Sequence, residues 1–385
     1  MLENWQIGGF GLYVHWPFCQ SKCPYCDFNS HVVASIDHDA WLNAYIAEID
    51  RYAAETPDRI LNSIYFGGGT PSLMAPATVG AIIERAAHHW TFANDIEITL
   101  EANPGSIEAQ NFAGYKAGGV NRISVGIQAL NDTDLKRLGR LHTVSEAKQA
   151  LTLAKSLFDR VSFDLIYARQ DQSMDAWKDE LQCALSFGAD HLSLYQLTIE
   201  PGTAFGARFD AGKLQGLPPD ELATDMYFLT QQMTTDAGLP AYEVSNHAAP
   251  TQESRHNMIY WRSGDWVGIG PGAHGRLTID GTRFASEAPL SPALWLSAAA
   301  NGAAENIRSV IELDEQTTEY LLMGLRTTEG IDLDRLDDQF KSRLNINKIK
   351  GLIELSLVEV TDQTLKATRA GRPVLNAIIR ELLPD

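Results

Sequence analysis

Three of the four cysteines in this 385-residue chain lie close together, at Cys19, Cys23 and Cys26. The spacing C-x3-C-x2-C concentrates thiolates in one short loop, which is typical of a metal site. A cubane iron–sulfur cluster has four irons, and each takes one ligand from outside the cluster. Three cysteines therefore leave one iron free to bind a small chelating ligand. The loop predicts a place for chemistry and not only for electron storage.

A zinc site is the alternative for the same thiols. Structural zinc takes four ligands, usually from paired C-x2-C hooks, and His15 or His31 would have to complete the set. The remaining cysteine, Cys183, falls in a predicted helix and is expected to be a buried apolar side chain.

Clustered thiols without a disulfide framework predict a reducing compartment such as the cytosol.

Composition limits the partners of the chain. It has 31 Lys and Arg against 49 Asp and Glu, so its formal net charge is −18. An acidic surface argues against nucleic-acid binding but leaves room for a small anionic ligand in a local basic pocket. The N-terminal residues show no secretory leader pattern, and no apolar run of about 18 residues predicts a membrane span. We therefore expect a cytoplasmic protein that binds no nucleic acid.

The elements expected to position the cysteine loop alternate between strands and helices. Over residues 11–200, apolar runs suited to strands buried on both faces alternate with amphipathic stretches. The expected strands are Gly11–Trp16, Ile64–Phe66, Glu97–Glu101, Arg122–Ile127, Val161–Tyr167 and His191–Thr198. This pattern predicts an α/β fold built on a partial (β/α)6 barrel, with its site at the carboxyl ends of the strands.

The later part of the chain has a different pattern. We expect a partial barrel over residues 1–245, a connecting segment over 246–312 and a C-terminal unit over 313–385. The expected later elements are a strand at Ala241–Asn246, helices at Thr317–Arg326, Leu333–Lys341, Ile346–Leu355 and Val374–Leu383, and a hairpin at Val358–Leu365 around Asp362-Gln363. These elements predict a mainly helical, winged-helix-like domain. In so acidic a chain, a lid or docking role is favoured over DNA binding.

The cysteine loop, with Tyr25 directly before Cys26, resembles the radical S-adenosylmethionine (radical SAM) superfamily. Over nearly the whole chain, the resemblance narrows to the oxygen-independent coproporphyrinogen III oxidase family. It rests on the segments Tyr13–Cys19, Tyr65–Ser72, Glu101–Pro104, Arg122–Gln128 and Asp164–Tyr167. It implies a 4Fe-4S cluster on the three cysteines and S-adenosylmethionine (SAM) on the open iron. One electron from the reduced cluster would cleave SAM to methionine and a 5′-deoxyadenosyl radical.

The resemblance also implies a set of SAM-binding residues. Gly68 and Gly69 would let the backbone approach the methionine end of SAM, and Tyr13 would lie beside the cluster. The residues implied to hydrogen-bond the amino acid and ribose of SAM are Glu101, Gln128, Arg140 and Asp164. One segment departs from the family: many relatives have Gly-Leu-Pro-Gly-Gln where this chain has Ala168–Gln172.

Other departures resemble the branch of HemW-type haem chaperones. The oxidases carry a fourth cysteine where this chain has Phe28, and they have a longer segment before the cluster loop. The segment Arg255–Trp261 contains the H-N-x-x-Y-W signature of that branch, and Leu322–Ile331 resembles it as well.

The H-N-x-x-Y-W signature has two interpretations. The imidazole of His256 is a suitable axial ligand for haem iron, and Tyr260 and Trp261 offer flat faces with polar tips to a porphyrin. Alternatively, His256 and Asn257 form a polar turn, while Tyr260 and Trp261 fill the interface between the barrel and the C-terminal unit.

For function, the resemblance implies a haem chaperone that binds haem and passes it to membrane-bound respiratory haemoproteins. The cluster and SAM would then have structural or gating roles, and peripheral contact with the inner face of a membrane is allowed. This interpretation leans away from an enzyme, although the retained SAM residues leave SAM cleavage open. Two alternatives remain: oxidative decarboxylation of coproporphyrinogen III to protoporphyrinogen IX, and radical SAM chemistry on an unrelated substrate.

Overall fold

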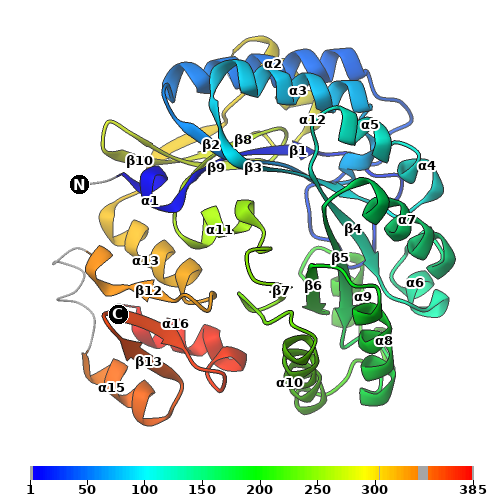
Figure 1. Cartoon of the computed structure of the whole chain (residues 1–385), viewed down its shortest axis with the longest axis vertical. Coiled ribbons are helices and arrows are strands. Elements are labelled where there is room, and N and C mark those ends of the chain that lie inside the picture. Colours follow the sequence, from blue (N-terminus) through cyan, green and yellow to red (C-terminus); the bar gives the residue numbers. More distant parts are fainter. Residues whose placement is uncertain (1–2, 303, 337–345, 384–385) are drawn as a thin grey trace.

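A long curved sheet organises the protein. The computed structural model describes residues 3–302, 304–336 and 346–383. In this described part, the main sheet has 11 strands in the order β11-β10-β9-β8-β1-β2-β3-β4-β5-β6-β7. Six consecutive strands run parallel: β1 (Phe10–Trp16), β2 (Ile60–Gly68), β3 (Thr91–Ala102), β4 (Arg122–Gln128), β5 (Arg160–Tyr167) and β6 (His191–Gln196). The predicted α/β partial barrel is confirmed, and among the described strands the end strands β11 and β7 are not paired to close it (Figure 1).

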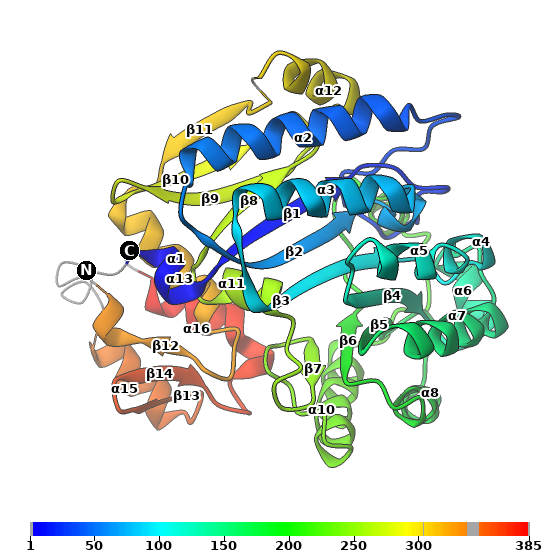
Figure 2. The ribbon, with the colours of Figure 1, turned by 45° about the horizontal axis from the view of Figure 1, so that its top comes forward.

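Helices cover the convex face of the sheet, as α2, α3, α7 and α8 show (Figures 1 and 2). The helical segments of this half are α2 (His38–Glu55), η1 (Pro71–Leu73), α3 (Pro76–His89), α4 (Ser106–Ala109), α5 (Phe112–Ala117), α6 (Asp132–Arg137), α7 (Val144–Leu157), α8 (Met174–Ser186) and α9 (Ala204–Asp210). Side-chain oxygens cap several of them: Asp37 accepts from the N–H of Ala40, and Ser173 accepts from that of Ala176. Such caps satisfy N–H groups that have no partner inside the helix.

The two faces of the parallel strands carry different side chains. In β1, Leu12 and Val14 are fully buried in the main apolar core, whereas Tyr13 between them is half-buried. Tyr65 in β2 and Asp164 in β5 alternate in the same way with buried apolar neighbours. Because successive side chains of a strand point to opposite faces, polar residues from several strands gather inside the curve.

The strands of residues 246–312 belong to the same sheet. β7 (Asn246–Ala248) pairs antiparallel with β6, and β8 (Asp265–Ile269) pairs parallel with β1. The remaining elements of this segment are α11 (Arg255–Trp261), β9 (His274–Ile279), β10 (Thr282–Glu287), α12 (Pro292–Ala300) and β11 (Ile307–Val310). α11 lies inside the curve of the sheet, below β1 to β3 in Figure 1.

The predicted strand at Ala241–Asn246 is wrong. The chain bends over these residues, with an isolated bridge at Ala241, and the strand β7 begins only at Asn246. The carboxylate of Glu243 accepts hydrogen bonds from the backbone N–H of Ser245 and the side chain of Asn246. These local bonds favour a turn over an extended strand.

The C-terminal unit has an apolar core of its own, which includes Leu321, Leu365 and Ile379. Its elements are α13 (Leu313–Gly324), β12 (Ile331–Asp332), η2 (Leu333–Arg335), α15 (Ile346–Glu354), β13 (Val358–Thr361), β14 (Thr364–Ala367), η3 (Arg372–Val374) and α16 (Leu375–Leu382). The mainly helical unit is confirmed. Its hairpin turns at Asp362-Gln363, where both residues have positive φ. The predicted helix Leu333–Lys341 starts as a 3-10 turn, and residues 337–341 lie outside the described residues.

Two further helices complete the described chain. α10 (Asp220–Asp236) packs against α8, and α1 (Asn4–Gly8) contacts α11 and β8. None of the helices described in this structure is both long and apolar enough to cross a membrane.

Candidate functional site

The three clustered cysteines lie on the loop that follows the carboxyl end of β1. Their thiols are free and half-buried, and burial raises the pKa of Cys19 and Cys26. Two backbone hydrogen bonds close the base of the loop: His31 donates to the Pro17 carbonyl at 2.7 Å, and Cys19 donates to the His31 carbonyl at 2.9 Å. The loop therefore presents the thiols at the edge of the sheet where the sequence predicted the site.

The histidines near the loop have partners of their own. His15 is buried, with Nδ1 2.9 Å from the Tyr13 hydroxyl and Nε2 2.9 Å from the Asn29 carbonyl. The Nε2 of His31 lies 3.1 Å from the Asn29 side chain. Among the described residues, no three His, Cys, Asp or Glu side chains converge as the ligands of one metal ion do. Both nitrogens of His15 are hydrogen-bonded, so zinc ligation by His15 would require one of these bonds to open.

Gly68 and Gly69 are required by close packing against β1 and the start of the cysteine loop. Gly68 has a φ of +110°, and a Cβ there would lie 2.6 Å from the ring of His15. A Cβ on Gly69 would lie 2.8 Å from the carbonyl oxygen of Phe18. The N–H groups of Gly69 and Thr70 donate to the carbonyls of Trp16 and Phe18. These contacts fix the end of β2 against the loop, and the predicted approach of SAM to the glycines stays a prediction.

Two carboxylates face the concave interior below the loop. Burial raises the pKa of Glu101 to about 7, although hydrogen bonds from the Tyr65 hydroxyl at 2.7 Å and from the Gly68 backbone lower it. Burial likewise raises the pKa of Asp164 to about 6, although the nearby positive charges of Arg122 and Arg140 lower it. Such acids bind a cationic or hydroxyl-rich ligand more readily than ordinary surface acids do, because the ligand replaces missing solvation.

Gln128 ends β4 in an unusual backbone conformation. Its φ is +73°, and the pairing of β4 with β5 shifts register between Val125 and Gln128. The side chain lies close enough to Asp164 to lower the pKa of its carboxyl. The bulge therefore aims a predicted SAM residue at its neighbour on the next strand.

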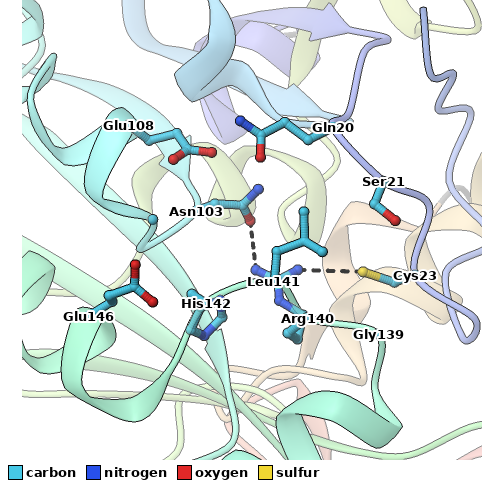
Figure 3. Close-up of a pocket in the computed structure, with 11 residues that line it drawn as sticks. Gln20, Ser21, Cys23, Asn103, Glu108, Gly139, Arg140, Leu141, His142 and Glu146 are labelled. Carbon is cyan, nitrogen blue, oxygen red and sulfur yellow. Dashed lines mark hydrogen bonds between the residues drawn. The ribbon is translucent and has the colours of Figure 1, made fainter.

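Arg140 lies beside the cysteine loop. One terminal nitrogen, Nη2, donates to the Gly126 carbonyl at 2.7 Å and to Oδ1 of Asn103 at 2.6 Å. The other, Nη1, points at the sulfur of Cys23 at 3.6 Å (Figure 3). A pocket of about 170 Å³ opens here, lined by Gln20, Ser21, Cys23, Asn103, Gly105, Glu108, Gly139, Arg140, Leu141, His142 and Glu146.

Three site residues were not singled out by the sequence: Tyr65, Thr70 and Asn103. Tyr65 binds Glu101, Thr70 donates to Cys19, and Asn103 joins Thr70 to Arg140. All three lie in or directly after segments that carried the family resemblance. The available signal was a polar side chain next to the carboxyl end of a strand.

The H-N-x-x-Y-W motif forms helix α11. His256 is only 1% exposed, with Nδ1 2.7 Å from the Ser63 hydroxyl and Nε2 2.6 Å from the Tyr260 hydroxyl. Burial lowers the pKa of His256 to about 3, so the imidazole is neutral. Asn257 is half-buried. The indole N–H of Trp261 is buried without a hydrogen-bond partner among the described residues.

Tyr65 connects this helix to the carboxylates. Its ring stacks on His256 with centroids 5.0 Å apart, and its hydroxyl donates to Glu101. Tyr13 stacks on the same two rings. Most predicted SAM residues thus meet at or near the carboxyl ends of the strands. His256 lies apart from them, among the rings of Tyr13, Tyr65 and Tyr260, in a part of the concave interior that we call the floor.

Cys183, the cysteine outside the loop, is on α8 and half-buried, not fully buried as expected.

Comparison with known families identifies two matching regions. The family model described as "Radical SAM superfamily" matches residues 13–183, and the family model described as "HemN C-terminal domain" matches residues 311–374. These ranges contain the cysteine loop with the parallel strands and the separate C-terminal unit.

Individual proteins are similar over most of the chain. "Heme chaperone HemW" of Haemophilus influenzae is 35% identical, over 97% of this chain and 98% of its own length. The same protein of Escherichia coli is 42% identical over 71% of each chain. A mitochondrial "Radical S-adenosyl methionine domain-containing protein 1" of Mus musculus is 38% identical over 97% of this chain and 87% of its own.

A solved structure is similar in fold. Coproporphyrinogen III oxidase (HemN) from Escherichia coli, described as a radical SAM enzyme, superposes with a TM-score of 0.81 at 22% identity. The superposition covers 97% of this chain and 90% of the oxidase.

Proposed function

Because this chain belongs to the radical SAM superfamily and, within it, to the family of HemW haem chaperones, we propose that it binds haem and passes it to respiratory haemoproteins. The observation that carries the proposal is the similarity to "Heme chaperone HemW" over 97% of this chain and 98% of the relative. A cytoplasmic location with peripheral contact at the inner face of a membrane is proposed with it, since membrane-bound acceptors require such contact.

We further propose that Cys19, Cys23 and Cys26 hold a 4Fe-4S cluster. Three soft sulfur donors on one loop suit iron–sulfur ligation, and two of the sulfurs already receive hydrogen bonds from neighbouring side chains. With SAM, the cluster would supply one-electron reductive cleavage of the sulfonium. Phe28, at the position where the oxidases carry a fourth cysteine, is 58% exposed and offers no ligand.

The proposed SAM site uses residues of the concave interior. Glu101 would accept from the amino group of SAM, and Asp164 with Gln128 would accept from and donate to ribose hydroxyls. Their neighbourhood supports this, because two acids with raised pKa values face one interior. The other proposed members are Tyr13, Gly68, Gly69 and Arg140.

The proposed haem-contacting residues are His256, Asn257, Tyr260 and Trp261. The neutral imidazole of His256 is the form that ligates iron. Both of its nitrogens are occupied by Ser63 and Tyr260, so ligation requires one of these hydrogen bonds to open. Tyr260 is half-buried whereas Ser63 is fully buried, so the bond to Tyr260 is the more accessible of the two.

Haem titration of the anaerobically reconstituted protein, followed by absorbance, tests the carrier proposal. We expect saturable binding that His256→Ala weakens. His191→Ala is a matched control, because buried His191 also bridges a serine and a tyrosine, Ser162 and Tyr242. Absence of saturable binding to the wild type would overturn the proposal. Equal weakening by both substitutions would remove His256 from the site.

An enzyme assay on the same preparation tests the main alternative. Coproporphyrinogen III is supplied with SAM and a reductant, and protoporphyrinogen IX is sought. We expect no conversion. Stoichiometric conversion would replace the chaperone proposal with the oxidase function.

A further inference from the structure

Two of the three loop thiols are hydrogen-bonded by side chains from two loops that lie far apart in the sequence. The hydroxyl of Thr70, after β2, donates to the sulfur of Cys19 at 3.3 Å. The guanidinium of Arg140, after α6, approaches the sulfur of Cys23 at 3.6 Å, as the dashed line in Figure 3 marks. Among the described residues, no side-chain donor to Cys26 is found, and its thiol faces a backbone N–H at Phe28.

Asn103 joins the two donors. Its Nδ2 donates to the Thr70 hydroxyl at 3.3 Å, and its Oδ1 accepts from Nη2 of Arg140 at 2.6 Å. The orientation of the amide is determined by its partners, because the hydroxyl of Thr70 already donates to sulfur and a guanidinium can only donate. The backbone N–H of Asn103 donates to Ser72, which fixes the bridge from behind.

The result is one continuous chain of hydrogen bonds from sulfur to sulfur, through Thr70, Asn103 and Arg140. A second bond from Nη2, to the Gly126 carbonyl, holds the guanidinium in place. In the described part of the protein, the hydrogen-bond acceptors of Arg140 are a sulfur, an amide oxygen and a backbone carbonyl, and none is a carboxylate. Its positive charge therefore acts on the cysteine loop at Cys23, in addition to its effect on Asp164.

We propose that this Thr70–Asn103–Arg140 chain raises the reduction potential of the cluster. Reduction adds one electron from an external one-electron donor and makes the cluster and its thiolates more negative. Hydrogen bonds and positive charge at the sulfurs stabilise the reduced state more than the oxidised state. Arg140 is thus a positioning and tuning residue at Cys23, in addition to its proposed contact with SAM. The inference rests on the proposed cluster.

A potentiometric titration of the full-length, anaerobically reconstituted protein tests the inference. Dithionite is the reductant, no SAM is added, and the reduced cluster is followed by its electron paramagnetic resonance. At the midpoint potential of the wild type, Arg140→Met is expected to show a ratio of reduced to oxidised cluster that is about tenfold lower. This corresponds to a midpoint potential about 59 mV lower for a one-electron couple. Thr70→Val, which removes the hydroxyl without changing side-chain shape, is expected to lower it about threefold.

Lys22→Met is the matched control, because it removes one positive charge from an exposed side chain next to Cys23. We expect the midpoint potential of Lys22→Met to equal that of the wild type. Wild-type midpoints in both Thr70→Val and Arg140→Met would overturn the inference while leaving the cluster in place. Failure of the wild type to assemble any cluster would overturn the proposed function itself. If only Arg140→Met fails to assemble the cluster, the midpoint potential of Thr70→Val decides whether the inference holds.

Discussion

The cluster end and the floor of the concave interior differ in how their polar groups are satisfied. At the cluster end, Glu101 and Asp164 have pKa values raised by burial, and Nε of Arg140 is buried without a partner. On the floor, both nitrogens of His256 are bonded and its ring is stacked on Tyr65. Unsatisfied groups gain free energy from a ligand, whereas satisfied groups contribute to folding stability. The cluster end thus offers unsatisfied groups directly to a ligand. On the floor, the indole N–H of Trp261 is unsatisfied, but a ligand to His256 must first open an existing hydrogen bond.

The largest expected effect is at the cluster end. Cys23→Ala should abolish the brown 4Fe-4S absorbance, because the remaining two thiolates cannot hold the cluster. Iron content and the visible spectrum after reconstitution provide the measurement. Cys183→Ala, on α8 and away from the loop, should leave both unchanged. An intact cluster spectrum in Cys23→Ala would refute the assignment of the loop.

A substitution on the floor is expected to lower the stability of the fold. His256→Ala removes a buried ring and leaves the hydroxyls of Ser63 and Tyr260 without their shared partner. We expect the free energy of unfolding to fall by about 2–4 kcal/mol. Urea unfolding of the protein without cluster measures this. A loss below about 0.5 kcal/mol, typical of surface substitutions, would show that the floor is not supporting the fold.

Glu101→Gln should separate binding from stability. SAM affinity should fall by about 10- to 100-fold, because hydrogen bonds to a charged group contribute about 1.5–3 kcal/mol. Stability should be unchanged or higher, since a neutral amide is easier to bury than a carboxylate. Equilibrium dialysis with SAM measures affinity, with the exposed Glu84→Gln as control. Unchanged affinity would remove Glu101 from the SAM site.

The affinity for SAM should also depend on pH. Glu101 titrates near pH 7, so its carboxylate is protonated at lower pH and loses its attraction for an amino group. Affinity should therefore fall about tenfold from pH 8 to pH 6. In Glu101→Gln this dependence should flatten, leaving the smaller contribution of Asp164 below pH 6. A pH-independent affinity in the wild type would contradict the raised pKa.

The smallest effect is expected at Tyr65, which joins the two regions. Tyr65→Phe keeps the ring stacked on His256 but removes the hydrogen bond to Glu101. The pKa of Glu101 should rise, because that bond stabilises the carboxylate, and the pH profile for SAM should move to higher pH. Stability should change by about 1 kcal/mol or less. A shift to lower pH would contradict the proposed link.

The sequence was sufficient for the parallel core. Its six strands are short apolar runs with polar residues at their carboxyl ends, and local pattern alone specifies such strands. The cysteine spacing likewise identified the loop. The expected polar residues lie at or near the carboxyl ends of their strands, with Glu101 and Gln128 in the last two positions of β3 and β4 and Asp164 within β5.

Other features depend on contacts that no local pattern specifies. The bend at Glu243 arises from side-chain bonds to Ser245 and Asn246. The burial of His256 depends on Ser63, almost two hundred positions away in the chain. The bridge through Asn103 joins residues that follow β2, β3 and α6. Such long-range pairings become visible only when the fold is known.

Transfer of haem is the most direct test of the central claim. The reconstituted chain, loaded with one equivalent of haem, is mixed with the haem-free form of a respiratory cytochrome, and the absorbance of both proteins is followed. We predict that haem leaves this chain and that the cytochrome acquires its native haem spectrum. Haem that stays on this chain, or that reaches the cytochrome no faster than free haem does, would contradict the account.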